Sequence, residues 1–192
     1  MIILAVETSC DDTCVASLKV SGKKFPLFDI LSNIVSSQVK IHRKWGGVYP
    51  VLAKREHQRN LPIVLKNALK RANFSISNSE FVISKKNPNA KIQMPKIDLV
   101  AVTNGPGLEP CLWVGVNFAK DLAKKLKVSL VSVNHIEAHI LANFIKEQKT
   151  KNKEQLFPAV CLVVSGGHTQ LILMKDYGKY KILGETRDDA AG

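Results

Sequence analysis

The sequence lacks the features of membrane and secreted proteins. No apolar run approaches the roughly 18 residues that a membrane-spanning helix needs, and the apolar start of the chain is interrupted by Glu7, with no basic segment before it. The four cysteines, Cys10, Cys14, Cys111 and Cys161, have neither C-x-x-C nor zinc-finger spacing. This pattern is typical of reduced thiols in the cytosol. We therefore expect a cytoplasmic protein that has no membrane partner.

Arginine is scarce although the chain is basic. Lys and Arg number 28 against 16 acidic residues, a formal net charge of +12, and only five of the cations are Arg. A lysine-rich surface is either simply solvated or a surface that binds a polyanion through its positive charge. Composition leaves both interpretations open, but 45% hydrophobic and 23% charged residues indicate a globular chain.

The spacing of the apolar residues predicts an α/β fold. Strands are expected at 2–6, 14–20, 28–36, 97–103 and 129–133. Helices are expected at 51–72, at 112–126 and from 134 onward. The polar, patternless segment 73–96 is expected to be a surface insertion.

The opening pattern of the chain returns near its end. After a basic linker at 146–156, strands are expected at 157–164, 170–175 and 179–184, with a small polar turn after the first. The repeat of strand, turn, strand, strand predicts two related domains, at 1–145 and 157–192. Because the second copy has no equivalent of the earlier helices, we expect it to be incomplete, to lack a core of its own, and to mark the chain as a fragment.

His135 and His139 are the best candidates for metal ligands. Imidazoles four residues apart lie on one face of a helix and can bind one metal. A zincin motif, H-E-x-x-H, would place its general base at the second position, whereas Glu137 is at the third and points away. A metallopeptidase is therefore disfavoured, and a merely polar helix face stays possible.

Two polar turns follow the first strand of each repeat. They are Glu7-Thr8-Ser9-Cys10-Asp11 and Ser165-Gly166-Gly167-His168-Thr169. Each is consistent with an ordinary β-turn or with a backbone nest that binds an anion. Two equivalent turns that face one cleft would suit a nucleotide.

These segments, together with others, resemble the bacterial tRNA N(6)-adenosine threonylcarbamoyltransferase family in the family's own order. The matching segments are Glu7-Thr8-Ser9-Cys10-Asp11, Ser37-Gln38, Gly46-Gly47-Val48-Tyr49-Pro50, Gly105-Pro106-Gly107-Leu108, His135-Ile136-Glu137-Ala138-His139, Val164-Ser165-Gly166-Gly167-His168-Thr169-Gln170, Gly184-Glu185-Thr186 and Asp188-Asp189-Ala190-Ala191-Gly192. Asp12 and Val51 stand where the family often has Glu.

The resemblance implies an actin/hexokinase/Hsp70-like (ASKHA) fold of two RNase-H-like domains, the second truncated here. It implies that His135 and His139 bind one divalent metal, Fe²⁺ with Zn²⁺ as the alternative, and that the family's third ligand, an Asp, lies beyond residue 192. It implies that threonylcarbamoyl-adenylate is bound by the loop of Val163, Val164, Ser165, Gly166 and Gly167. Asp11 is our candidate catalytic residue, for cation or proton handling.

The implied activity is an acyl transfer in tRNA modification. The threonylcarbamoyl group moves to N6 of the adenosine 3′ of the anticodon, in tRNAs that read codons beginning with A. The implied partners are tRNA, a related non-catalytic paralogue and an ATPase subunit. The alternatives are that non-catalytic paralogue, which lacks the metal histidines, and an ASKHA-fold kinase or ATPase. We expect the 192 residues to be inactive alone.

Overall fold

The structure is a computed structural model that describes residues 1–22, 27–76, 83–85, 97–145, 157–165 and 167–187. The chain divides into two compact units, Met1–His135 and Ile136–Gly192. The expected linker, 146–156, and most of the expected insertion, 73–96, lie outside the described residues. The domain boundaries expected at 145 and 157 stay a prediction.

The first unit is built on a mixed five-stranded sheet. The strands are β1 (Ile2–Glu7), β2 (Asp12–Ser21), β3 (Leu27–Ser37), β6 (Leu99–Gly105) and β7 (Ser129–Asn134), in the order β3-β2-β1-β6-β7. β1 pairs antiparallel with β2 and parallel with β6, and β6 pairs parallel with β7. The side chains of β1, which the sequence shows as an apolar run, alternate between buried and half-buried, as successive side chains of a strand do. The α/β class is therefore confirmed.

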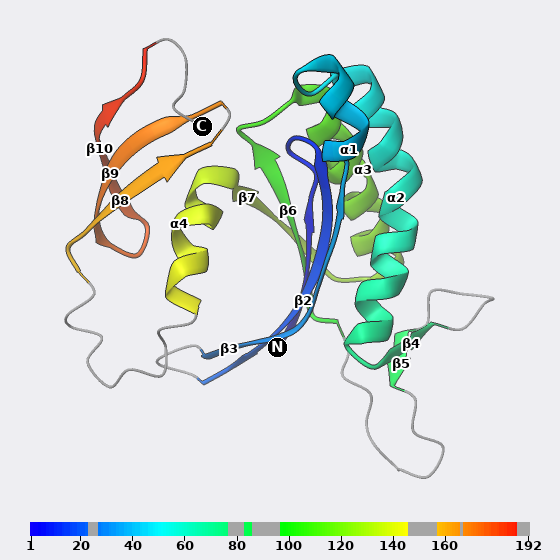
Figure 1. Cartoon of the computed structure of the whole chain (residues 1–192). Helices are drawn as coiled ribbons and strands as arrows, with labels where there is room; N and C mark the ends of the chain where they lie inside the picture. The colour runs from blue at the N-terminus through cyan, green and yellow to red at the C-terminus, as the bar shows by residue number, and fades with distance from the viewer. Residues whose placement is uncertain (23–26, 77–82, 86–96, 146–156, 166, 188–192) are drawn as a thin grey trace. The chain divides into compact units, whose positions relative to one another are not determined.

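Two long helices, α2 (Pro50–Arg71) and α3 (Glu109–Leu126), pack on one face of this sheet (Figure 1). The predicted stripe on α2 is confirmed, because Leu61, Val64, Leu65, Ala68 and Leu69 are all buried. Each helix has Pro in its first turn, where the missing N–H costs nothing. α3 ends at Lys127, whose left-handed backbone turns the chain into β7.

The sequence analysis did not predict several short helices and strands. They are α1 (Val39–His42), the 3₁₀ helix η1 (Arg43–Trp45), and the paired strands β4 (Phe74–Ile76) and β5 (Ile83–Lys85). The last two lie within segment 73–96, which was expected to be a surface insertion. Three or four residues are too few to show a periodic pattern, so only pairing or packing reveals them.

The second unit joins α4 (His135–Ile145) to a three-stranded antiparallel sheet. The strands are β8 (Ala159–Val164), β9 (Thr169–Asp176) and β10 (Lys179–Glu185), in the order β10-β9-β8. The repeat of strand, turn, strand, strand is thus confirmed, since β1-β2-β3 and β8-β9-β10 share the same antiparallel order. The core is small and lies between helix and sheet: Ile136, Ile140, Val163, Ile172 and Met174. The strands β8 and β9 therefore share a core with α4, which the sequence analysis had placed in the first domain.

Candidate functional site

The turn between β1 and β2 is held in place by its carbonyl groups. Three consecutive carbonyls, on residues 9 to 11, accept hydrogen bonds from three different segments of the first unit. The donors are Leu108 N–H to Ser9 (2.7 Å), His57 Nε2–H to Cys10 (3.0 Å) and Gln38 N–H to Asp11 (3.0 Å). Hydrogen bonds at three successive carbonyls fix the backbone from which the Asp11 side chain extends. The predicted catalytic role of Asp11 itself stays a prediction.

Two glycines let other backbone and side-chain atoms approach this turn. Gly107 has φ +159°, and a Cβ there would lie 2.6 Å from the carbonyl oxygen of Ser9. Gly115 on α3 lies directly against the hydroxyl of Thr8, which donates to the carbonyl of Cys111 (2.9 Å). The chain at Gly107 and α3 at Gly115 are thus packed on the turn with no room for a side chain at either position.

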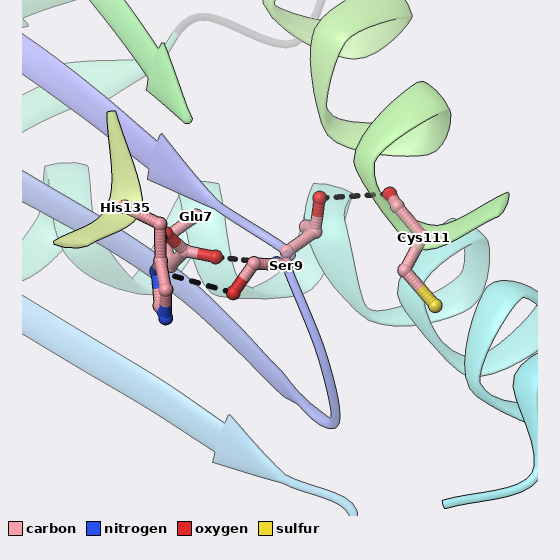
Figure 2. A network of polar contacts seen from close by, with 5 residues as sticks. Glu7, Ser9, Cys111 and His135 are labelled. Carbon is pink, nitrogen blue, oxygen red and sulfur yellow. Dashed lines mark hydrogen bonds and ion pairs between the residues drawn. The ribbon is translucent and has the colours of Figure 1, made fainter. Parts of the chain in front are cut away.

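His135 contacts the same turn. Figure 2 shows its ring beside Glu7 and Ser9: Nδ1 is 3.2 Å from Glu7 Oε2 and 3.3 Å from Ser9 Oγ. The backbone N–H of Ser9 also donates to Glu7 Oε1. Burial by itself would raise the pKa of Glu7, but the hydrogen bonds from His135, Ser9 and Thr103 outweigh it and lower the pKa to about 2.

The carboxylate orients the His135 imidazole. Since an ionised Glu7 can only accept, Nδ1 of His135 carries a proton, which leaves Nε2 as the ring nitrogen that can bind a metal. A carboxylate that holds the Nδ1–H of a histidine is the usual support of a metal-binding imidazole. Glu7 was not among the residues predicted to act in the site, although it stands in the first polar turn.

His139 lies one helical turn further along α4 and lines a cavity in the second unit. The cavity has a volume of about 440 Å³ and is lined by α4 and by β8 with the start of the following turn. Val163, Val164 and Ser165 line it together with His139. Three of the predicted substrate-binding residues and one predicted metal ligand therefore share one cavity. Gly167 is exposed, and Gly166 lies outside the described residues.

Glu137 is directed to a different partner. Its Oε1 accepts a hydrogen bond from the Tyr180 hydroxyl (2.9 Å), within the second unit. Burial and this contact with Glu137 raise the pKa of Tyr180 to about 12. A carboxylate that accepts from a tyrosine on β10 is not placed as the base of a metallopeptidase, in agreement with the sequence argument.

The metal site itself stays a prediction. Within the part of the chain that the structure describes, no group of three His, Cys, Asp or Glu side chains could hold a metal ion. His135 and His139 supply two imidazoles on one helix, which suits Fe²⁺ or Zn²⁺ but leaves a catalytic site one protein ligand short.

The helices that the structure describes include none with the length and hydrophobicity of a membrane span.

A buried polar network behind the turn was missed by the sequence analysis. His57, Gln38 and Thr13 are fully buried, and His42 is almost so. The signal was present on α2, because His57 precedes Leu61 by four residues and follows Ala53 by four. A histidine on a buried helical stripe indicates a buried polar group that needs partners.

One side-chain oxygen near the turn is unsatisfied. Asp12 Oδ1 is buried and has no hydrogen-bond partner among the described residues. Burial and then the charge of Asp12 raise the pKa of Cys14, which lies on the same strand, to about 12. Asp12 is also a position where the chain departs from the pattern of the family that it resembles.

Comparison with known proteins agrees with these features. The chain matches TsaD, tRNA N6-adenosine threonylcarbamoyltransferase, over residues 29–88 and 81–192. It is 48% identical over 190 residues to the tRNA N6-adenosine threonylcarbamoyltransferase of Clostridium novyi, covering 99% of this chain and 47% of that protein. For the protein of the same name from Clostridioides difficile the identity is 45% over 192 residues, covering 100% of this chain and 48% of that protein.

The chain spans about half the length of these relatives. Among solved structures, YeaZ from Pseudomonas aeruginosa is similar over 96% of this chain and 66% of its own, with 16% identity and a TM-score of 0.47. From the family match and these relatives, the chain belongs to the tRNA N6-adenosine threonylcarbamoyltransferase family.

Proposed function

We propose that this chain is part of an enzyme that transfers a threonylcarbamoyl group from threonylcarbamoyl-adenylate to N6 of the adenosine 3′ of the anticodon, in tRNAs that read codons beginning with A. Its relatives carry the name of this activity. The observation that carries the proposal is the cavity in which His139 is brought to Val163, Val164 and Ser165. A metal-assisted transfer needs a metal ligand beside the loop that binds the substrate, and this cavity supports such a role.

The transfer exchanges one acyl bond for another. The adenosine amine forms a bond to the carbamoyl carbon, the bond from that carbon to the adenylate oxygen breaks, and the adenylate leaves with its phosphate charge. The amine also loses a proton. Asp11, on a turn with three fixed carbonyls, is the carboxylate that we assign to this proton or to a cation beside the phosphate.

His135 and His139 would hold a divalent metal, with Glu7 orienting His135 through Nδ1. When bound, a metal supplies Lewis-acid polarisation of the carbamoyl carbonyl. The segment of Val163, Val164, Ser165, Gly166 and Gly167 would bind the adenylate, with backbone N–H groups as donors to phosphate. The contact of Glu137 with Tyr180 argues against a metallopeptidase.

We further propose that the two units are the RNase-H-like halves of an ASKHA fold, since both begin with the same strand order. The partners would be tRNA, a related non-catalytic paralogue and an ATPase subunit. The basic net charge is compatible with a polyanionic substrate.

The test is a chimaera in which this chain replaces the aligned residues of the C. novyi relative. Threonine incorporation into tRNA is measured with threonylcarbamoyl-adenylate supplied. We expect the chimaera to be active, His139→Ala to abolish activity, and Lys175→Ala, an exposed position on β9, to leave it unchanged. Full activity after His139→Ala would refute the role of this cavity, and we expect the 192 residues alone to give no product.

A further inference from the structure

In the buried network next to the β1–β2 turn, the hydrogen bonds form a chain in which each group donates to the next. The Tyr49 N–H donates to His42 Nδ1 (3.3 Å), and His42 Nε2 donates to Gln38 Oε1 (3.0 Å). The Gln38 amide then faces His57 Nδ1 (3.4 Å), and His57 Nε2 donates to the carbonyl of Cys10 (3.0 Å). Because a carbonyl can only accept, the last contact requires the Nε2–H tautomer of His57, and every earlier contact agrees with it.

His57 is also held from the strand side. The Thr13 hydroxyl donates to the same Nδ1 atom (2.8 Å). Protonation of Nδ1, or a change to the Nδ1–H tautomer, would point an N–H at the Gln38 amide group, which can only donate there, and would force the Thr13 hydroxyl to rotate and accept instead. The buried contacts therefore favour a neutral imidazole whose only N–H donates to the turn.

Gln38 supports the turn once directly and once through His57. Its side chain faces His57, while its backbone N–H donates to the carbonyl of Asp11 (3.0 Å). The carbonyls of Cys10 and Asp11 thus depend on one network. We propose that His57 is a positioning residue: through the Cys10 carbonyl it fixes the turn and thereby the place of Asp11. This inference rests on the role proposed above for Asp11.

Burial favours the neutral state of His57 despite nearby carboxylates. The charged groups that face it are Glu7, Asp11 and Asp12 of the β1–β2 hairpin, and the nearest titratable group from α1 is His42, which lies beyond Gln38. Burial lowers the pKa of His57, and these carboxylates, together with the Cys10 carbonyl, only partly offset it. A neutral ring is thus maintained next to an acidic turn.

Cys10 provides a reporter of the turn that needs no catalytic activity. Cys10 is an exposed residue, so its thiol can be alkylated in the folded chain. Partial desolvation, followed by the charge and hydrogen bond of Asp11, raises the pKa of this thiol from 9.0 to about 11. If the turn lost its hydrogen bond to His57, the pKa of the Cys10 thiol would fall toward its ordinary value. At pH 8 the thiolate population would rise on the order of 100-fold, and the lower nucleophilicity of the weaker base would reduce the gain in alkylation rate to about 10-fold.

The first measurement uses the wild-type chain with ¹⁵N-labelled histidine and long-range ¹H–¹⁵N correlation spectra between pH 6 and 8. We expect His57 to stay neutral with its proton on Nε2 throughout. An Nδ1–H tautomer, or a charged His57 at pH 6, would overturn the proposal without any variant.

The second measurement maps the iodoacetamide alkylation rate of Cys10 by mass spectrometry. We expect His57→Leu, which removes the donor, to raise the rate about 10-fold, and His57→Gln, whose amide can donate to the carbonyl, to restore it to within about 2-fold. Gln58→Leu, at the adjacent exposed position, is the matched control. Hydrogen exchange in β1 and β6 confirms that each variant is folded.

An unchanged Cys10 rate in folded His57→Leu, or no rescue by His57→Gln, would refute the positioning role. Neither measurement depends on threonylcarbamoyl transfer. An inactive chimaera with these expected results would therefore reject the proposed function and leave the positioning of the turn intact.

Discussion

Gly115→Ala should destabilise the first unit, although Gly→Ala inside a helix is normally favourable. The methyl group would overlap Thr8 Oγ1 and lie 3.4 Å from both Cβ and Cγ2 of Thr8. Thr8 is only 1% exposed, and its hydroxyl is bound to the Cys111 carbonyl one turn earlier on α3. Neither the helix nor the turn can move away without breaking a buried contact.

The magnitude follows from three opposing terms. Helix propensity favours Ala by up to about 1 kcal/mol. Overpacking a buried site costs about 1–3 kcal/mol, and leaving the Thr8 hydroxyl unsatisfied costs about 1–3 kcal/mol more. We therefore expect a net loss of about 3 kcal/mol in the free energy of unfolding, within a range of about 1–5 kcal/mol, which is above the effect of an ordinary surface change.

The assay is urea unfolding followed by circular dichroism at 222 nm, where α2 and α3 dominate the signal of the first unit. Gly47→Ala, which meets no atom within 4 Å, is the matched control and should change stability by less than about 0.5 kcal/mol. Thr8→Ala makes room for the methyl group, so the double variant should be more stable than the sum of the single effects by about 1 kcal/mol. A neutral or stabilising Gly115→Ala, or strict additivity, would refute the close contact.

Three further predictions follow from the structure. Burial lowers the pKa of His57 below 6.5, so the unfolded chain takes up this proton first. The free energy of unfolding should fall between pH 7 and 5.5 by up to about 1.4 kcal/mol per pH unit, and pH titration of His57→Gln should show a smaller slope. Leu65→Ala, at 1% exposure, should cost about 2–5 kcal/mol in the same urea assay, whereas Ile63→Ala, at 55% exposure, should cost less than about 1 kcal/mol. In calorimetric titrations the chain should bind Zn²⁺ weakly, and His135→Ala and His139→Ala should each abolish that binding, because a single imidazole is a poor ligand; binding that survives either change would place the metal elsewhere.

Local patterns in the sequence determined the main elements of this protein. An apolar run predicted β1, alternation predicted β2, and the stripe from Leu61 to Leu69 predicted α2, because all three patterns depend only on neighbours within one element. The motifs likewise predicted the family, and the H-x-x-x-H spacing placed two imidazoles on one helix. The start of α3 was predicted three residues late, since an initial Glu-Pro carries no periodic signal.

Only the tertiary structure decided which distant groups meet. Glu7 orients His135 across 128 positions of sequence, and Thr13 holds His57 across 44. The parallel pairing of β1 with β6 brings the G-P-G segment onto the first turn, so that Leu108 binds the Ser9 carbonyl. Such contacts depend on how the chain closes into a sheet, and no periodicity within one element records that closure. For the same reason His57 could be read from the sequence as one more residue of a helical stripe, while its hydrogen bond to the Cys10 carbonyl became visible only when the strand, the turn and the helix were packed together.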